Sequence, residues 1–242
     1  MTMLLSDRSS RLRARMTRRA RITLGIDEAG RGPAIGPMVI AAVALDSRAA
    51  AALTRSGLRD SKSFGAGEEA HAIRLQLASE IRTRAKFVSS IEIEHTEIDT
   101  RVVRHELNLL ERELATRLIS QAPECHRIIA DGKRMFGPLT QRFVQFESLD
   151  YAEEHHASVA AASVIAKTIR DSRFAAIRAR YESEFGPIIG GGYANAGTRR
   201  FIRAYVERYG RLPEETRRSW PHPYVADLIG DVRPAGPQLC LM

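Results

Sequence analysis

An apolar run that ends in two adjacent acids constrains this chain more than any other feature. Residues 22–26 have the pattern of a strand, and Asp27, Glu28 and then a Gly-Arg-Gly turn follow them. A buried carboxylate without a partner is costly, so an apolar strand should end in such charges only where something compensates them. Mg²⁺ is a simple partner, because it takes one or two carboxylates together with phosphate oxygens and water. The segment therefore indicates a metal-dependent phosphodiesterase, and the alternative is a tight turn that leaves the acids exposed.

The hydrophobic periodicity along the chain predicts strands alternating with helices, which is typical of a mixed sheet flanked by helices. We expect the first two strands to form a hairpin around the Gly-Arg-Gly turn. In the first long helix, Ile73, Leu77 and Ile81 should share one buried face. The expected strands are 22–27, 38–45, 87–93, 127–130 and 143–146, and the expected helices are 68–84, 102–118, 159–180 and 198–209.

The two ends of the chain differ in composition from the middle. Residues 1–21 are rich in arginine and serine, which favours a flexible basic N-terminal arm, or an over-extended start with Met16 as the true initiator. An organelle presequence is a weaker alternative. We expect one catalytic domain over 22–222 and a loosely attached C-terminal tail over 223–242.

The net charge of +8 and pI near 10.0 indicate a polyanionic partner such as nucleic acid. Arginine greatly outnumbers lysine, so a general compositional bias is the alternative explanation. No apolar run is long enough to span a bilayer, and the two cysteines have no metal-binding spacing. These features predict a cytoplasmic protein with no membrane partner, and we expect a monomer.

A series of motifs in this order resembles the type 2 ribonucleases H, the ribonuclease HII family. The resemblance runs from about Ile22 to Trp220, and it is carried by Asp27-Glu28-Ala29-Gly30-Arg31-Gly32, Asp60-Ser61-Lys62, Asp131-Gly132, residues 161–167 and Gly192-Tyr193. It implies a ribonuclease H-like fold, with a mixed five-stranded sheet and a helical C-terminal extension that helps to hold a duplex. It also implies an endonuclease that cuts the RNA strand of RNA–DNA hybrids. Such an enzyme also cuts 5′ to ribonucleotides embedded in DNA, leaving 3′-hydroxyl and 5′-phosphate ends.

A two-metal site needs several carboxylates that converge from separate elements. Asp27 and Glu28 supply two, although neighbours on an ideal strand face opposite sides, so both serve only if the strand ends and twists there. Asp131 follows a short apolar strand and is the third candidate. We therefore expect a site for Mg²⁺ or Mn²⁺, with two ions in the active complex.

The fourth acid is the point where this chain departs from the family. Type 2 enzymes place an aspartate about ten residues before the serine of the segment that is Ala161–Lys167 here, and that position holds Glu153. Asp150 is the alternative and would need a gap. We choose Glu153, because Ala152-Glu153 resembles the Ala-Glu pair of the sister group, ribonuclease HIII.

The resemblance also implies residues that contact the substrate. The Gly-Arg-Gly turn would surround the 2′-hydroxyl at the cut, Tyr193 would lie against the next sugar, and Lys62 would contact a phosphate. Ser163 and Lys167 are four residues apart and therefore share a helix face. Arg170-Asp171 is expected to be structural, and Arg217 and Arg218 are expected to follow the duplex backbone. The predicted substrate-contacting residues are Gly30, Arg31, Gly32, Lys62, Ser163, Lys167 and Tyr193.

Three alternatives remain open from the sequence. One is a ribonuclease HIII-like preference for long RNA–DNA hybrids, which Glu153 favours and Arg31 and Tyr193 oppose. Another is a nucleic-acid-binding module whose active site has decayed. The third is another nuclease or transposase-like member of the same fold, which would have no reason to contain both the Gly-Arg-Gly turn and the Gly-Tyr pair.

Overall fold

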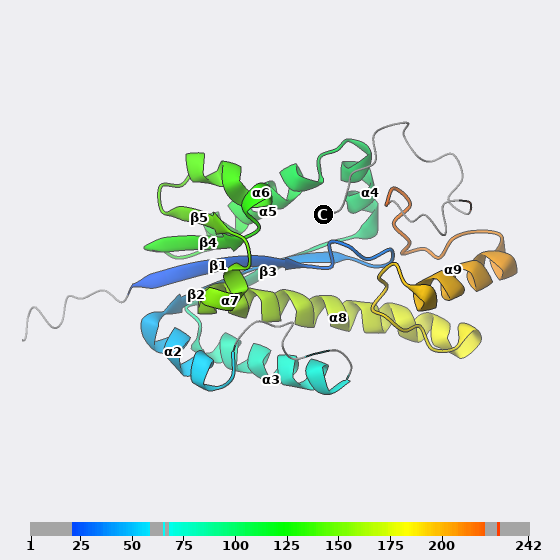
Figure 1. The fold of residues 1–242 in the computed structure, drawn as a ribbon, viewed down its shortest axis with the longest axis horizontal. Helices are drawn as coiled ribbons and strands as arrows, with labels where there is room; N and C mark the ends of the chain where they lie inside the picture. The colour runs from blue at the N-terminus through cyan, green and yellow to red at the C-terminus, as the bar shows by residue number, and fades with distance from the viewer. Residues whose placement is uncertain (1–20, 59–64, 66–67, 221–226, 228–242) are drawn as a thin grey trace, which may run out of the picture.

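A five-stranded sheet with helices on both faces forms the centre of the molecule (Figure 1). The computed structural model describes residues 21–58, 65, 68–220 and 227. The strands lie in the order β3-β2-β1-β4-β5, and β1 pairs antiparallel with β2 and parallel with β4. The mixed sheet predicted from the sequence is thereby confirmed. The strands are β1 Ile22–Ala29, β2 Met38–Asp46, β3 Phe87–Ile93, β4 Arg127–Asp131 and β5 Phe146–Leu149.

Helices cover the two faces of the sheet in two groups (Figure 1). One group, with α8 at its centre, packs on alternate residues of β2 such as Val39 and Val43, and the other packs on Met38 and Ile40. Strand β2 is buried on both sides, which explains why it is apolar throughout. The first group is α2 Ser47–Arg55, α3 Glu68–Arg84 and α8 Ala157–Phe185, and the second is α4 His95–Val103, α5 Leu107–Gln121 and α6 Lys133–Phe136.

The alanine-rich start of α8 lets this helix approach β1 closely. Ala160, Ala161 and Ala162 are buried against the sheet. On the facing strand, a Cβ added to Gly25 would lie 2.1 Å from the carbonyl carbon of Ser158. Small residues on both sides therefore place α8 directly beside the strand that carries Asp27 and Glu28.

The helical C-terminal extension predicted from the sequence is present as α9, Ala196–Tyr209 (Figure 1). Its aromatic residues pack on the end of α8: the ring centroids of Tyr181 and Phe201 are 5.2 Å apart, and those of Phe185 and Tyr205 are 5.5 Å apart. This aromatic cluster attaches α9 to the main body and holds the glycine-rich loop before it close to the sheet.

Three details of the sequence prediction were wrong. The single helix expected over 102–118 is two helices, α4 and α5, because His105 takes a left-handed conformation with φ of 58°. The strand expected over 143–146 begins at Phe146 instead, since a 3₁₀ turn, η2 Gly137–Gln141, and Val144 at the surface come before it. In α3, Ile73 is exposed and the polar Arg74 is buried in its stead.

The predicted basic arm over 1–21 and the tail over 223–242 lie outside the described residues, apart from Arg21 and Asp227, and Lys62 lies outside them too. The predicted domain boundaries therefore stay predictions. Of the helices in the described part of the chain, none combines the length and apolar character needed to cross a membrane.

Candidate active site

The candidate site lies where the parallel strands β1 and β4 separate. Their pairing ends at Ile26 and Ala130, and the next residues are Asp27 on β1 and Asp131 on β4. In sheets of this kind, ligands bind beyond the carboxyl ends of parallel strands. The backbone thus brings two acids together that are far apart in the sequence.

Asp27 and Glu28 lie on opposite sides of β1, which continues to Ala29. Asp27 faces α8, where the Ser163 side chain hydrogen-bonds to its carboxylate, and Glu28 interacts with Arg31 and with Glu111 of α5. Both acids nevertheless line one cavity of about 440 Å³. The strand ends one residue after Glu28, at Ala29, and the cavity at this end of β1 takes in both of its sides.

The third and fourth acids reach the same cavity from β4 and α7, the short helix Ala152–His155. One carboxylate oxygen of Asp131 accepts a hydrogen bond of 2.8 Å from the backbone N–H of Ala152, which fixes the start of α7. Glu153, the next residue, is only 3% exposed and lines the cavity. Asp150 is exposed, accepts a 2.8 Å hydrogen bond from the Lys133 N–H and does not line the cavity. The geometry therefore groups Glu153, rather than Asp150, with the other acids.

Burial and neighbouring acids raise the pKa of Asp27 and Glu28. Burial, together with the negative charges of Asp131 and Glu153, raises the pKa of Asp27 to about 7, although the hydrogen bond from Ser163 acts to lower it. Burial also raises the pKa of Glu28 well above its usual range, followed by repulsion from Asp27 and Glu111. Carboxylates that are held close together in a partly dry site store repulsion that a cation would relieve.

The side-chain positions do not by themselves form a metal cage. Among the described residues, no group of three or more histidine, cysteine or acidic side chains is arranged so that it could already hold an ion. The donor set still fits a hard divalent cation, because it consists of carboxylate oxygens around an open cavity, and the pKa is raised for two of the acids, Asp27 and Glu28.

The turn Gly30-Arg31-Gly32 forms the next part of the cavity wall. Gly30 has φ of +82°, and a Cβ there would lie 2.7 Å from the Pro37 carbonyl oxygen, so only glycine fits without strain. The Arg31 guanidinium turns back toward α5, where it pairs with Glu111 and donates a 2.7 Å hydrogen bond to Asn108. The backbone of this turn, more than the Arg31 side chain, is therefore available to the cavity.

Tyr193 lies beside this turn on the glycine-rich loop that precedes α9. A Cβ at Gly32 would be 3.5 Å from the tyrosine ring, and the Gly192 carbonyl accepts a 2.8 Å hydrogen bond from the Ala34 N–H. Arg170 supports this loop. Its guanidinium donates a hydrogen bond to the Gly191 carbonyl, and the guanidinium carbon is 5.4 Å from the Tyr193 ring centroid. Tyr193 itself is 49% exposed, with one side of the ring supported and the rest open to solvent.

Helix α8 contributes several residues to the cavity. Ser163 is buried under Asp27, and Lys167, one turn further on, is partly exposed at the rim. Arg170 also lines the cavity, although the sequence suggested only a structural role. Its position three residues after Lys167 on the same helix was the available signal. By contrast, no sequence motif marked Glu111 or Arg74 as part of this region.

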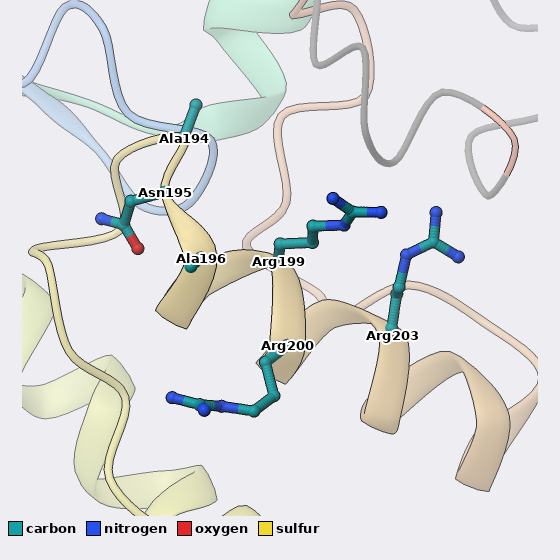
Figure 2. A pocket seen from close by; sticks show the side chains of 6 residues that line it. All are labelled: Ala194, Asn195, Ala196, Arg199, Arg200 and Arg203. Carbon is teal, nitrogen blue, oxygen red and sulfur yellow. The ribbon is translucent and has the colours of Figure 1, made fainter.

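A second hollow, of about 390 Å³, lies at the start of α9 directly after Tyr193 (Figure 2). Arg199 and Arg203 extend from one side of the helix and Arg200 from another (Figure 2). Asn195 caps the helix by accepting a 3.0 Å hydrogen bond from the Thr198 N–H. The hollow is therefore strongly basic and adjoins the candidate active site.

A mixed five-stranded sheet with acids gathered at the ends of its central strands defines a nuclease of the ribonuclease H-like fold. The family model for Ribonuclease HII matches residues 24–222, so the chain belongs to the ribonuclease HII family. A ribonuclease HII of Methanothermobacter thermautotrophicus is 34% identical over 205 residues, which cover 81% of this chain and 95% of the relative.

Solved structures show the same likeness. The ribonuclease H2 of Pyrococcus horikoshii OT3 superposes with a TM-score of 0.72 at 25% identity, covering 87% of this chain and 98% of that protein. The ribonuclease HII in the PCNA complex from Archaeoglobus fulgidus gives a TM-score of 0.66 at 29% identity, covering 81% and 91%. The chain is thus a ribonuclease H that hydrolyses RNA in RNA–DNA hybrids, from a family that depends on divalent metal ions.

Proposed function

We propose that this enzyme cuts on the 5′ side of single ribonucleotides embedded in duplex DNA, as well as within the RNA strand of hybrids. The products would carry 3′-hydroxyl and 5′-phosphate ends. The observation that supports this is the shared cavity, in which the acids lie next to the Gly30–Gly32 turn and Tyr193. Chemistry and ribose recognition would then act on adjacent atoms of one nucleotide.

In this proposal Asp27, Glu28, Asp131 and Glu153 hold Mg²⁺ or Mn²⁺, with two ions in the active complex. Bound there, the ions would activate the attacking water and stabilise the leaving oxygen. The acids act as ligands and not as nucleophiles. The hydrogen bond from Ser163 orients Asp27, and the Ala152 N–H orients Asp131, so both carboxylates are directed by the protein before an ion binds.

Ribose would be read by the backbone of the turn and by Tyr193. A 2′-hydroxyl is both donor and acceptor, which is what lets a protein distinguish RNA from DNA at one position. The N–H groups of the turn can approach it because Gly30 and Gly32 add no side chain. The Tyr193 ring would pack on the sugar of the next nucleotide, and Lys167 and Lys62 would contact phosphates near the cut.

The basic hollow at the start of α9 would bind the duplex backbone beyond the cut. Arg199 and Arg200 are exposed there, and phosphate contacts by arginine supply affinity without regard to sequence. Arg217, which the sequence suggested for this role, is completely buried and is replaced in the proposal by these two residues. We expect the enzyme to act as a monomer.

A ribonuclease HIII-like preference for long hybrids is the second candidate. The observation in its favour is that a glutamate, Glu153, is the buried acid of α7, whereas Asp150 is exposed. A glutamate reaches one methylene further than an aspartate, which would change the distance between the ions and the ribose reader. The two candidates differ in which substrate is cut faster.

The test uses two labelled substrates, a DNA duplex with one ribonucleotide and a long RNA–DNA hybrid, with Mg²⁺ or Mn²⁺. Wild type, Glu153→Ala and Asp150→Ala are compared. The proposal expects cleavage 5′ to the ribonucleotide, lost with Glu153→Ala and retained with Asp150→Ala. Loss only with Asp150→Ala would overturn the choice of the fourth acid. Cleavage of the hybrid alone would favour the second candidate, and cleavage of neither would indicate a decayed binding module.

A further inference from the structure

Arg217 is a completely buried arginine that lies behind the Gly30–Gly32 turn. Its side chain is 0% exposed, which is rare for arginine unless the guanidinium is fully paired. The pairing here is with backbone: Nε donates to the Gly36 carbonyl at 2.9 Å, Nη1 to Arg31 at 2.8 Å and Nη2 to Gly30 at 2.6 Å. One planar group thus joins three carbonyls of the segment that carries the turn.

The segment around Arg217 is itself fixed to the residues that follow the turn and to α4. The Arg217 N–H donates to the Ala34 carbonyl at 2.8 Å, and the Gly36 N–H donates to the Glu215 carbonyl at 3.0 Å. On the other side, the Asp99 carboxylate accepts hydrogen bonds from the Arg218 N–H at 2.9 Å and the Ser219 N–H at 3.0 Å. Arg217 is therefore held in place from both directions and has little freedom to follow a moving turn.

These contacts determine where the N–H groups of the turn point. The described residues contain no cis peptide bond, and in a planar trans peptide the carbonyl and the next N–H point in opposite directions. Because the Gly30 and Arg31 carbonyls point at Arg217, the N–H groups of Arg31 and Gly32 must point away from it. The turn lines the cavity and Arg217 does not, which favours an orientation of those N–H groups toward the cavity.

We propose that Arg217 is a positioning residue that fixes the N–H groups of Arg31 and Gly32 for the ribose, and so sets how well the enzyme recognises a single ribonucleotide. It acts through the turn and never touches the substrate. The inference rests on the proposed function, in which this turn reads the 2′-hydroxyl. Lysine cannot replace arginine here, because a single ammonium group cannot span three carbonyls that a planar guanidinium joins.

The experiment compares Arg217→Lys with wild type on the single-ribonucleotide duplex and the long hybrid. Two controls are matched to it: Arg82→Lys changes an exposed arginine of α3, and Leu53→Ala removes part of a buried side chain of α2. We expect kcat/KM on the single ribonucleotide to fall by about 10- to 100-fold in Arg217→Lys, the scale seen when a supporting residue lets a site shift. The kcat/KM on the hybrid should fall less, because the hybrid offers many ribonucleotides in succession.

A purely structural role would give a different result. If Arg217→Lys lowers Tm as Leu53→Ala does and leaves the ratio of the two activities unchanged, the proposal is overturned. Should Arg217→Lys fail to fold, Asp99→Asn serves instead, because it weakens the attachment of the segment to α4 while the guanidinium stays in place. The proposal then expects a smaller fall in the ratio of single-ribonucleotide to hybrid activity. An unchanged ratio overturns it.

Amide hydrogen exchange separates this inference from the proposed function. The proposal expects faster exchange at the Arg31 and Gly32 N–H groups in Arg217→Lys, with an unchanged Mg²⁺-induced rise in Tm, and unaltered exchange overturns it. A wild type that cuts the hybrid but not the single ribonucleotide would overturn the proposed function, and the exchange result would then decide the inference about Arg217 by itself.

Discussion

In the acid part of the cavity the side chains repel one another, whereas the two arginines at the turn beside it have hydrogen-bond partners within the protein. Burial and neighbouring negative charges raise the pKa of Asp27 and Glu28. At the turn, Arg217 is paired with three carbonyls and Arg31 is paired with Glu111. The acid part therefore holds a repulsion that a cation would relieve, whereas the turn is held in place by hydrogen bonds within the protein.

In the proposed function, this difference lets one cavity combine a metal centre with a selective reader. Repulsion among the acids lowers stability and favours binding of the ions, because binding to the folded state adds to its stability. A reader that must distinguish one hydroxyl group instead needs rigid donors, since a displacement of about 1 Å can cost about 100-fold in rate. In the proposal, the buried Arg217 supplies that rigidity through its hydrogen bonds to the turn.

The largest expected effect comes from Asp27→Asn, which removes one acid and keeps its shape. Activity should fall by more than the roughly 10- to 100-fold that is typical of residues that only support a metal ligand. In the absence of metal the same variant should have a higher Tm than wild type, because the repulsion with Asp131 and Glu153 is gone. Cleavage assays and thermal melts in chelator check both. If metal-free Asp27→Asn has a Tm equal to or below that of wild type, the acids do not repel one another as described, and the difference between the two parts of the cavity is contradicted.

Metal should stabilise the protein through the acids alone. At an Mg²⁺ concentration about 100 times the dissociation constant, the folded state gains about 2.7 kcal/mol. For a protein of this size that corresponds to a rise in Tm of about 5–10 °C. Asp27→Asn should lose most of this rise, and Arg217→Lys should keep it. Equal rises in wild type and Asp27→Asn would show that the ion binds elsewhere.

The pH dependence of stability in chelator should also report on the acids. Asp27 has a pKa of about 7 in the folded protein and 3.8 in the unfolded chain, so between these values the folded state holds more protons. Its stability therefore decreases as the pH rises through that window and levels off above it, and each pKa unit corresponds to about 1.4 kcal/mol. Melts from pH 5 to 8.5 should show a shallower decline for Asp27→Asn. Parallel curves for the two proteins would contradict the raised pKa.

The smallest effect should come from Tyr193→Ala, on the reader side. The ring is half exposed and supported by Arg170, so Tm should change little. Cleavage of the single-ribonucleotide duplex should fall by about 3- to 10-fold, the equivalent of one aromatic contact worth roughly 1 kcal/mol. Tyr193→Phe keeps the ring and should retain the activity. A loss confined to the long hybrid would contradict the position of Tyr193 next to the cut.

The sequence alone determined the features that depend on neighbouring residues. The strand that ends in Asp27 and Glu28, the Gly-Arg-Gly turn, the acid at the end of β4 and the helix α9 all follow from local periodicity and turn chemistry. The family resemblance in motif order was likewise readable, and the match over residues 24–222 confirmed it. These properties are local, so the chain carries them before it folds.

Only the tertiary structure decided which polar residues became buried, because burial depends on elements that are distant in the sequence. Arg217 looked like a surface residue for the duplex, yet it pairs with the turn 187 positions away. Glu111 joins Arg31 across 80 positions, and Glu153 rather than Asp150 enters the cavity because the Ala152 N–H is bound by Asp131. An arginine or glutamate has the same local pattern on a surface as in a core, and only its partners tell the two apart.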